Sequence, residues 1–160
     1  MNAARERTAE PVAGVAVDEV DAAYLESLIG YNARRAALAM IGAFLPGMAA
    51  FDLRPVDFSV LSLVLHNPGI TSRQLCATLG ILPPNLVGLV GTLERRGLVA
   101  RQPHPTDRRA MGLHLTGEGR ALMRKAERTA AGIEARVASR LSAAEARTLI
   151  RLLRKVYMDR

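Results

Sequence analysis

The stretch Leu82–Leu115, LPPNLVGLVGTLERRGLVARQPHPTDRRAMGLHL, decides the fold of this 160-residue chain. Its pattern predicts a helix that ends at Gly97, a strand over 98–102, a charged turn over 103–109 and a second strand over 110–115. Four apolar residues at helical spacing define the buried face of that helix: Leu86, Leu89, Val90 and Leu93. A helix followed by a charged hairpin suits two adjacent DNA grooves, so the stretch predicts sequence-specific DNA binding.

Two helices are expected upstream of this one. Pro55 opens the first, at a position where its missing N–H costs nothing. Thr71 and Gln74 fit a capping box that opens a short second helix. After a tight turn, Pro83 stands at the first position of the longer helix. A short helix, a turn and a longer helix form the helix-turn-helix pattern, and a winged helix-turn-helix domain is therefore expected over 54–116.

The N-terminal region predicts an arm followed by a long helix. Residues 1–17 mix Ala, Gly, Pro and charges of both signs without a period, which indicates a flexible arm. Residues 18 to about 44 have helical character, and 33–43 are apolar nearly all round. Such a helix is buried on more than one side, and we expect another subunit to supply the second covering surface. Pro46 and Gly47 should bend or end it.

Two more helices are expected after the hairpin. Thr116 can cap the first, and Ser142 with Glu145 forms a capping box for the second. The predicted inner positions are Leu122, Ala126, Thr129, Ile133 and Val137 in the first, and Ala146, Leu149, Ile150, Leu153 and Val156 in the second. The predicted fold class is mainly α with a small β-hairpin wing: a winged helix-turn-helix plus a helical dimerisation body over 18–50 and 117–160.

Composition narrows the partners of the chain. A net charge of +7 and a pI near 10.7, almost entirely from arginine, favour an anionic partner, with nucleic acid ahead of an anionic membrane surface. An aromatic content of 4% without Trp disfavours a stacking platform for single strands, so duplex DNA is expected. The longest apolar run is too short to cross a bilayer, and no signal peptide is evident at Met1, so a cytoplasmic protein is expected.

No catalytic set emerges from the residue types present. Three scattered histidines, one cysteine and the absence of HExxH or paired CxxC motifs predict neither a metal site nor a nucleophile with its base. We therefore expect no enzyme activity and no cofactor. Cys76 lies among apolar residues of the short helix and is interpreted as a small buried hydrophobe.

The candidate DNA contacts lie on the exposed face of the longer helix and on the hairpin. Asn85 and Thr92 are the expected base readers, and asparagine can pair with adenine through two hydrogen bonds. Five arginines and one aspartate between residues 95 and 109 are expected to serve mainly phosphates or a minor groove. The full set of candidates is Thr71, Ser72, Pro84, Asn85, Gly88, Thr92, Arg95, Arg101, His104, Asp107, Arg108 and Arg109, with Arg96 as a further phosphate candidate.

The order of elements resembles the MarR family of bacterial winged-helix transcription regulators. The residues that carry the resemblance are Leu93-Glu94-Arg95-Arg96-Gly97-Leu98-Val99, Asp107-Arg108-Arg109, and Leu113-His114-Leu115-Thr116 before Gly117-Glu118-Gly119. The resemblance implies a homodimer held by its first and last helices on a palindromic operator, with Asp107 orienting Arg109 toward a minor groove. The chain departs from the family pattern at Gly88 and Gly91, where a basic or hydroxyl-bearing residue is common.

The resemblance also implies a small effector, an aromatic or phenolic acid or its coenzyme A thioester, that releases the operator. The candidate ligand-binding residues are Tyr31, Arg34, Phe44, Phe58 and His66. Core packing and a dimer salt bridge are the alternative roles for these side chains. Arg34 is the first choice for a carboxylate, although periodicity leaves open whether Arg34 or Arg35 points inward.

The predicted function is therefore a ligand-responsive transcription regulator, with repression favoured. The alternative is a winged-helix module that binds an acidic protein partner. The sequence does not specify the operator, the regulated genes or the effector.

Overall fold

The computed structural model of the chain describes residues 19–103 and 111–158. The chain divides into two compact units, residues 1–34 and 35–160. In the first unit, helix α1 (Ala23–Glu26) is followed by the start of helix α2 (Ile29–Met48). The side-chain amide of Asn32 donates to the carbonyls of Glu26 and Leu28 at 2.7 and 2.8 Å, which satisfies backbone acceptors at the break. The single helix expected from residue 18 is thus wrong: there are two helices, and α2 continues through Pro46 to Met48.

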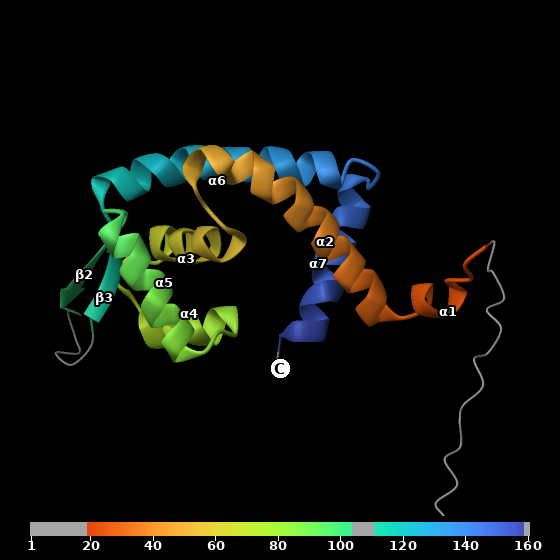
Figure 1. Ribbon diagram of the computed structural model, residues 1–160, viewed down its shortest axis with the longest axis horizontal. Helices are drawn as coiled ribbons and strands as arrows, with labels where there is room; N and C mark the ends of the chain where they lie inside the picture. The colour runs from red at the N-terminus through yellow and green to blue at the C-terminus, as the bar shows by residue number, and fades with distance from the viewer. Residues whose placement is uncertain (1–18, 104–110, 159–160) are drawn as a thin grey trace, which may run out of the picture. The chain divides into compact units, whose positions relative to one another are not determined.

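The second unit has the element order of a winged helix (Figure 1). After α2 come η1 (Ala49–Phe51), α3 (Pro55–His66), β1 (Ile70–Thr71), α4 (Ser72–Leu79), α5 (Pro83–Arg95), β2 (Val99–Pro103), β3 (Met111–Leu115), α6 (Gly117–Val137) and α7 (Ala143–Tyr157). The short α4 and the longer α5 are the predicted helix-turn-helix. The predicted fold class is confirmed, as are Pro55 at the start of α3 and the Thr71 capping box.

The sheet is antiparallel, with strand order β1-β3-β2. Val99 pairs with Leu115 and Pro103 with Met111, so β2 and β3 form the predicted hairpin. Strand β1 is an addition to the prediction: Ile70 pairs with Leu113 at the other edge of β3. Two residues are too few to show the alternation that identifies a strand in sequence.

The core lies between the inner face of the sheet and helices α3 to α6. All four predicted inner residues of α5 are buried: Leu86, Leu89, Val90 and Leu93. Gly97 has the left-handed φ of +69° that the predicted end of the helix requires. In α6 the buried residues are Gly119, Met123, Ala126 and Ile133, whereas Leu122, Thr129 and Val137 are half-buried. The predicted inner face of α6 was therefore displaced by about one residue near its start.

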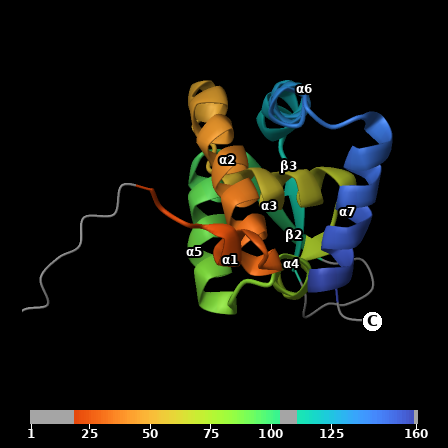
Figure 2. The same ribbon diagram turned by 90° about the vertical axis from the view of Figure 1, so that its right-hand side faces the viewer.

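Helix α6 runs from the winged lobe to α7 (Figures 1 and 2). The predicted Ser142 cap of α7 is confirmed, because Glu145 N–H donates to the Ser142 hydroxyl and the Glu145 carboxylate accepts from it and from the Ser142 amide. The predicted apolar seam of α7 is exposed within one chain: Leu149, Ile150, Leu153 and Val156 are 38–69% exposed. Within the described residues, no single helix is long and apolar enough to cross a membrane.

Candidate nucleic-acid interface and effector groove

Helix α5 turns one face to the core and the other to solvent. Its exposed residues are Pro83, Pro84, Asn85, Val87, Gly88 and Arg95, while Gly91, Thr92 and Glu94 are half-buried. A partner can therefore reach Pro84, Asn85, Gly88 and Arg95, which their predicted contact with DNA requires. Val87, 63% exposed, was not among the predicted candidates, because an apolar side chain in a helix is usually assigned to the core.

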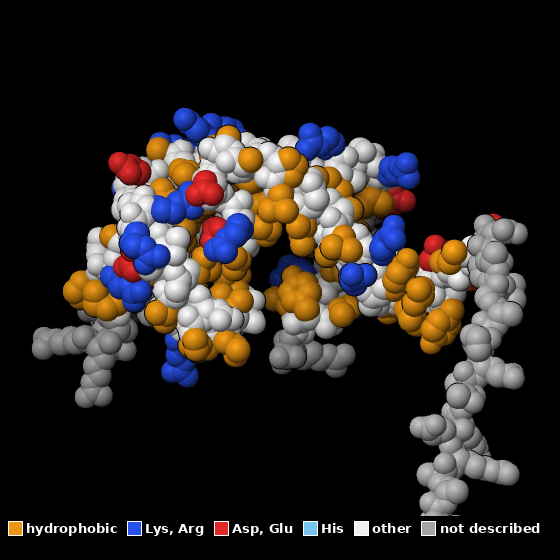
Figure 3. Space-filling view, viewed as in Figure 1, with side chains coloured by type: hydrophobic (Ala, Val, Ile, Leu, Met, Phe, Trp, Pro, Cys, Tyr) orange, Lys and Arg blue, Asp and Glu red, His pale blue; other side chains and the backbone are white. Residues whose placement is uncertain are grey.

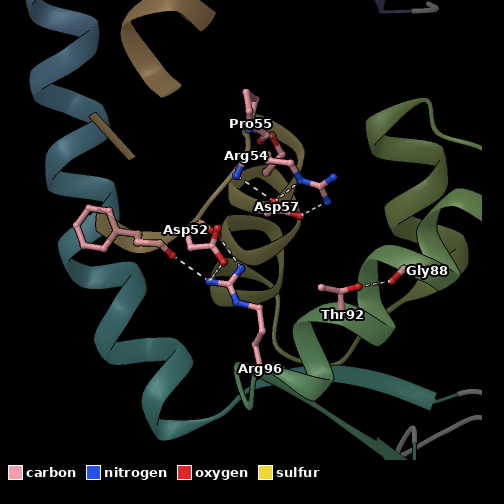
Figure 4. A network of polar contacts seen from close by, with 9 residues as sticks. Asp52, Arg54, Pro55, Asp57, Gly88, Thr92 and Arg96 are labelled. Atoms are coloured by element: carbon pink, nitrogen blue, oxygen red, sulfur yellow. Dashed lines mark hydrogen bonds and ion pairs between the residues drawn. The ribbon is translucent and has the colours of Figure 1, made fainter. Parts of the chain in front are cut away.

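The hydroxyl of Thr92 is engaged inside the helix. It donates to the carbonyl of Gly88 at 3.0 Å (Figure 4). It also accepts from the Arg95 guanidinium at 2.9 Å. Because its proton and one lone pair are used, this hydroxyl has little capacity left for a base edge. The side chain of Thr92 thus offers mainly its methyl group.

Arg96 fixes the end of α5 to the turn before α3 (Figure 4). Its guanidinium donates to the carbonyl of Asp52 at 2.7 Å and to that of Phe51 at 2.9 Å, and lies 3.6 Å from the Asp52 carboxylate. Asp52 has a left-handed φ of 49°, which turns the chain from η1 toward α3. These contacts give Arg96 a positioning role in this structure, and its expected phosphate contact stays a prediction.

A buried carboxylate holds the start of α3. Asp57 accepts from the Arg54 backbone N–H at 3.0 Å and from the Arg54 guanidinium at 2.8 and 3.0 Å (Figure 4). Burial acts to raise the pKa of Asp57, but these hydrogen bonds and the charges of Arg54 and Arg96 outweigh it, so the pKa lies below its usual value. The folded protein therefore stabilises the ionised form of Asp57, near the turn that Arg96 contacts.

Arg101 on β2 pairs with Glu94 on α5. The guanidinium donates to the two carboxylate oxygens at 2.8 and 3.3 Å, with both side chains partly exposed. The pair ties the hairpin to the exposed end of α5, and a phosphate approaching Arg101 meets a partly neutralised charge.

The start of α4 carries Thr71 and Ser72. Both are half-buried, and the Thr71 hydroxyl accepts from Gln74 N–H and donates to its side-chain oxygen. Thr71 therefore has a capping role in this structure. The remaining hairpin candidates, His104, Asp107, Arg108 and Arg109, lie outside the described residues, and their DNA contacts stay predictions.

An apolar groove of about 300 Å³ lies in the second unit among α2, α3 and α6. Its lining residues are Met40, Ile41, Phe44, Pro55, Phe58, Ser59, Ala130, Ala131, Ile133 and Glu134. The rings of Phe44 and Phe58 meet edge to face, with centroids 5.5 Å apart and an interplanar angle of 74°. Among the described residues that line the groove, Glu134 is the only charged one.

The groove brings together two of the five candidate ligand residues, Phe44 and Phe58. His66 is not among its lining residues: its Nε2 lies 2.9 Å from the Glu127 carboxylate, which also accepts from Ser62. Tyr31 and Arg34 belong to the first unit and stay predictions. The sequence did not predict the lining residues from α6, because alanines such as Ala130 and Ala131 are common in any helix. In the described chain, no group of three metal-binding side chains is present.

The fold and the exposed helix define a winged-helix DNA-binding protein. A family model described as MarR family matches residues 51–110. A helix-turn-helix transcriptional repressor of Mycobacterium tuberculosis is 30% identical over 145 residues, covering 89% of this chain and 97% of the relative.

Two solved structures are also similar. The repressor CouR bound to a 23-mer DNA duplex is 37% identical with a TM-score of 0.82, covering 88% of this chain and all of that one. CouR from Rhodococcus jostii bound to p-coumaroyl-CoA is 31% identical with a TM-score of 0.77, covering 82% and 93%. The chain belongs to the MarR family, and it is a transcription regulator.

Proposed function

We propose that this protein is a cytoplasmic repressor without catalytic activity, which binds a palindromic DNA duplex as a homodimer and leaves it when an aromatic acyl effector binds. The observation that carries the proposal is the solvent-facing side of α5, held at its end by Arg96 and joined to the hairpin by Glu94 and Arg101. Arginine at the hairpin turn, between residues 104 and 110, supplies the minor-groove contact.

The dimer rests on the terminal helices. Leu149, Ile150, Leu153 and Val156 place an uncovered apolar stripe along α7, and Figure 3 shows hydrophobic side chains exposed there. A stripe of this kind in a soluble chain marks an interface, and a second copy covers it with no further partner required. Residues 18–50 and 117–160 then form the dimerisation body, and 54–116 form the DNA-binding domain.

The effector site is the groove beside Phe44 and Phe58. An aromatic ring fits its apolar walls, and its volume is at the lower end of the range for small-molecule sites. Glu134 repels a carboxylate but accepts a hydrogen bond from a phenol, which favours an acyl group whose carboxylate has been converted to a neutral thioester group over the free acid. This choice agrees with the p-coumaroyl-CoA bound to CouR.

The effector proposal is tested by fluorescence anisotropy with a labelled operator. Addition of p-coumaroyl-CoA should release the operator, whereas free p-coumarate at the same concentration should release much less. Glu134→Gln is the matched variant, since it removes the charge and keeps the shape, and it should narrow the gap between the two compounds. Equal release of wild-type protein by acid and thioester would contradict the role given to Glu134.

A further inference from the structure

The beginning of α5 exposes apolar side chains that have no role in the fold. Val87 is 63% exposed and Leu82, directly before the helix, is 69% exposed. Pro83 and Pro84 between them are exposed as well. Figure 3 shows hydrophobic side chains gathered at the end of the winged lobe where α4 ends and α5 begins. This small apolar surface lies on the helix that faces DNA in the proposed function.

Two glycines, Gly88 and Gly91, leave the centre of the same helix face without side chains. Helical spacing aligns Pro84, Gly88, Gly91 and Arg95 along one ridge, with Val87 and Thr92 on its two sides. A Cβ added at Gly88 would meet nothing within 4 Å, and one at Gly91 only the tip of Arg95 at 3.5 Å. Neither glycine has a positive φ, and glycine lowers helix stability relative to alanine. The fold therefore gives no reason for either glycine, whereas a surface that presses closely on this ridge does.

The polar groups near this ridge are largely engaged. The Thr92 hydroxyl bonds to Gly88 and Arg95, and Glu94 is paired with Arg101. Asn85 remains for hydrogen bonding to a base edge. The face consequently offers methyl groups, the Asn85 amide and the remaining N–H groups of Arg95 to a major groove. On the edges of the base pairs in that groove, the apolar group is the C5-methyl of thymine.

We propose that Val87 contacts the C5-methyl group of a thymine in each half-site of the operator. Gly88 and Gly91 let the helix backbone approach closely enough for this short side chain to reach the base. Val87 thereby becomes a specificity-determining residue, which recognises thymine by apolar contact with its methyl group and makes no hydrogen bond. The inference rests on the proposed DNA-binding function and names the chemistry that this helix recognises.

The test is an exchange of thymine for uracil, which removes only the methyl group. An operator is first obtained by selecting tight binders from random palindromic duplexes, and each thymine is then replaced symmetrically by deoxyuridine. Burial of one methyl is worth about fourfold in affinity, so one symmetrical pair should weaken binding about fifteenfold. Replacing a thymine outside the two half-sites is the control and should change nothing.

Two variants complete the test. Val87→Ala should weaken binding to the thymine operator by a similar factor. It should weaken binding to the uracil operator hardly at all, because the protein change and the base change remove the same contact. Gly88→Ala should raise Tm by about 2–4 °C and yet weaken operator binding. Uracil tolerated at every position, or Val87→Ala equally harmful on both operators, overturns the methyl contact alone. Absence of any preference over random DNA overturns the proposed function and this inference together.

Discussion

Removal of the Arg96 guanidinium tests how α5 is fixed to the rest of the winged-helix domain. The Arg96→Ala change deletes the donors that bind the carbonyls of Phe51 and Asp52 at 2.9 and 2.7 Å. It leaves two acceptors at the turn before α3 without their protein partner and removes the tie between that turn and the residue directly after α5. We therefore expect loss of stability without loss of the fold.

The magnitude follows from the exposure of the groups. A hydrogen bond from a charged donor contributes about 1–1.5 kcal/mol here, because Arg96 is only 26% exposed. The Asp52 carboxylate is 93% exposed and 3.6 Å away, so its ion pair adds less than about 0.5 kcal/mol. The total is about 2–3 kcal/mol, which corresponds to a fall in Tm of about 5–10 °C.

Urea unfolding at a fixed protein concentration measures this loss, since dimerisation makes stability depend on concentration. Arg95→Ala is the matched control: it is the neighbouring residue and undergoes the same chemical change, but its side chain is exposed. The control should change the free energy of unfolding by less than about 0.5 kcal/mol. Equal effects of the two substitutions, or an Arg96→Ala protein as stable as wild type, would refute the anchoring role.

Three further predictions concern the wing, the dimer and pH. Arg109→Ala should weaken specific DNA binding by about 1–3 kcal/mol in a gel-shift titration and leave the dimer intact, and unchanged affinity would count against the wing contact. Truncation after Leu141 removes the apolar stripe of α7 and should give monomers in sedimentation velocity, so a stable truncated dimer would contradict the proposed interface. The pKa of Asp57 is lower in the folded than in the unfolded chain, so its stabilisation is present above the unfolded value and disappears as pH falls through the folded value. Asp57→Asn should therefore be less stable than wild type at pH 7, with a difference that shrinks below about pH 4 in acid unfolding curves; a difference independent of pH would exclude this origin.

Local signals in the sequence predicted most of the fold. The four buried residues of α5, the left-handed Gly97 and the capping residues Thr71 and Ser142 depend on periodicity and on neighbours within a few positions. Such patterns can be recognised in the sequence because they follow from the geometry of the helix itself. The short β1 strand and the break before α2 were missed, since both depend on a few residues without a repeating pattern.

The missed parts of the site depend on distant partners. Arg96 looked like one more phosphate ligand, and only the approach of a turn 44 residues earlier in the chain shows its other role. His66 looked like a lining residue of a pocket, whereas Glu127 on α6 binds it. Val87 was overlooked because an apolar side chain in a helix is usually assigned to the core. Charge and periodicity identified the helix face that we propose meets DNA, but not the chemistry each side chain offers there.

Sequence-specific DNA binding is tested by the binding of the full-length protein to a palindromic operator, measured at several salt concentrations beside a random duplex of equal length. We expect two chains per operator, affinity that falls steeply as salt rises, and a preference for the operator of at least about a thousandfold. Equal affinity for both duplexes at every salt concentration would contradict the proposed function.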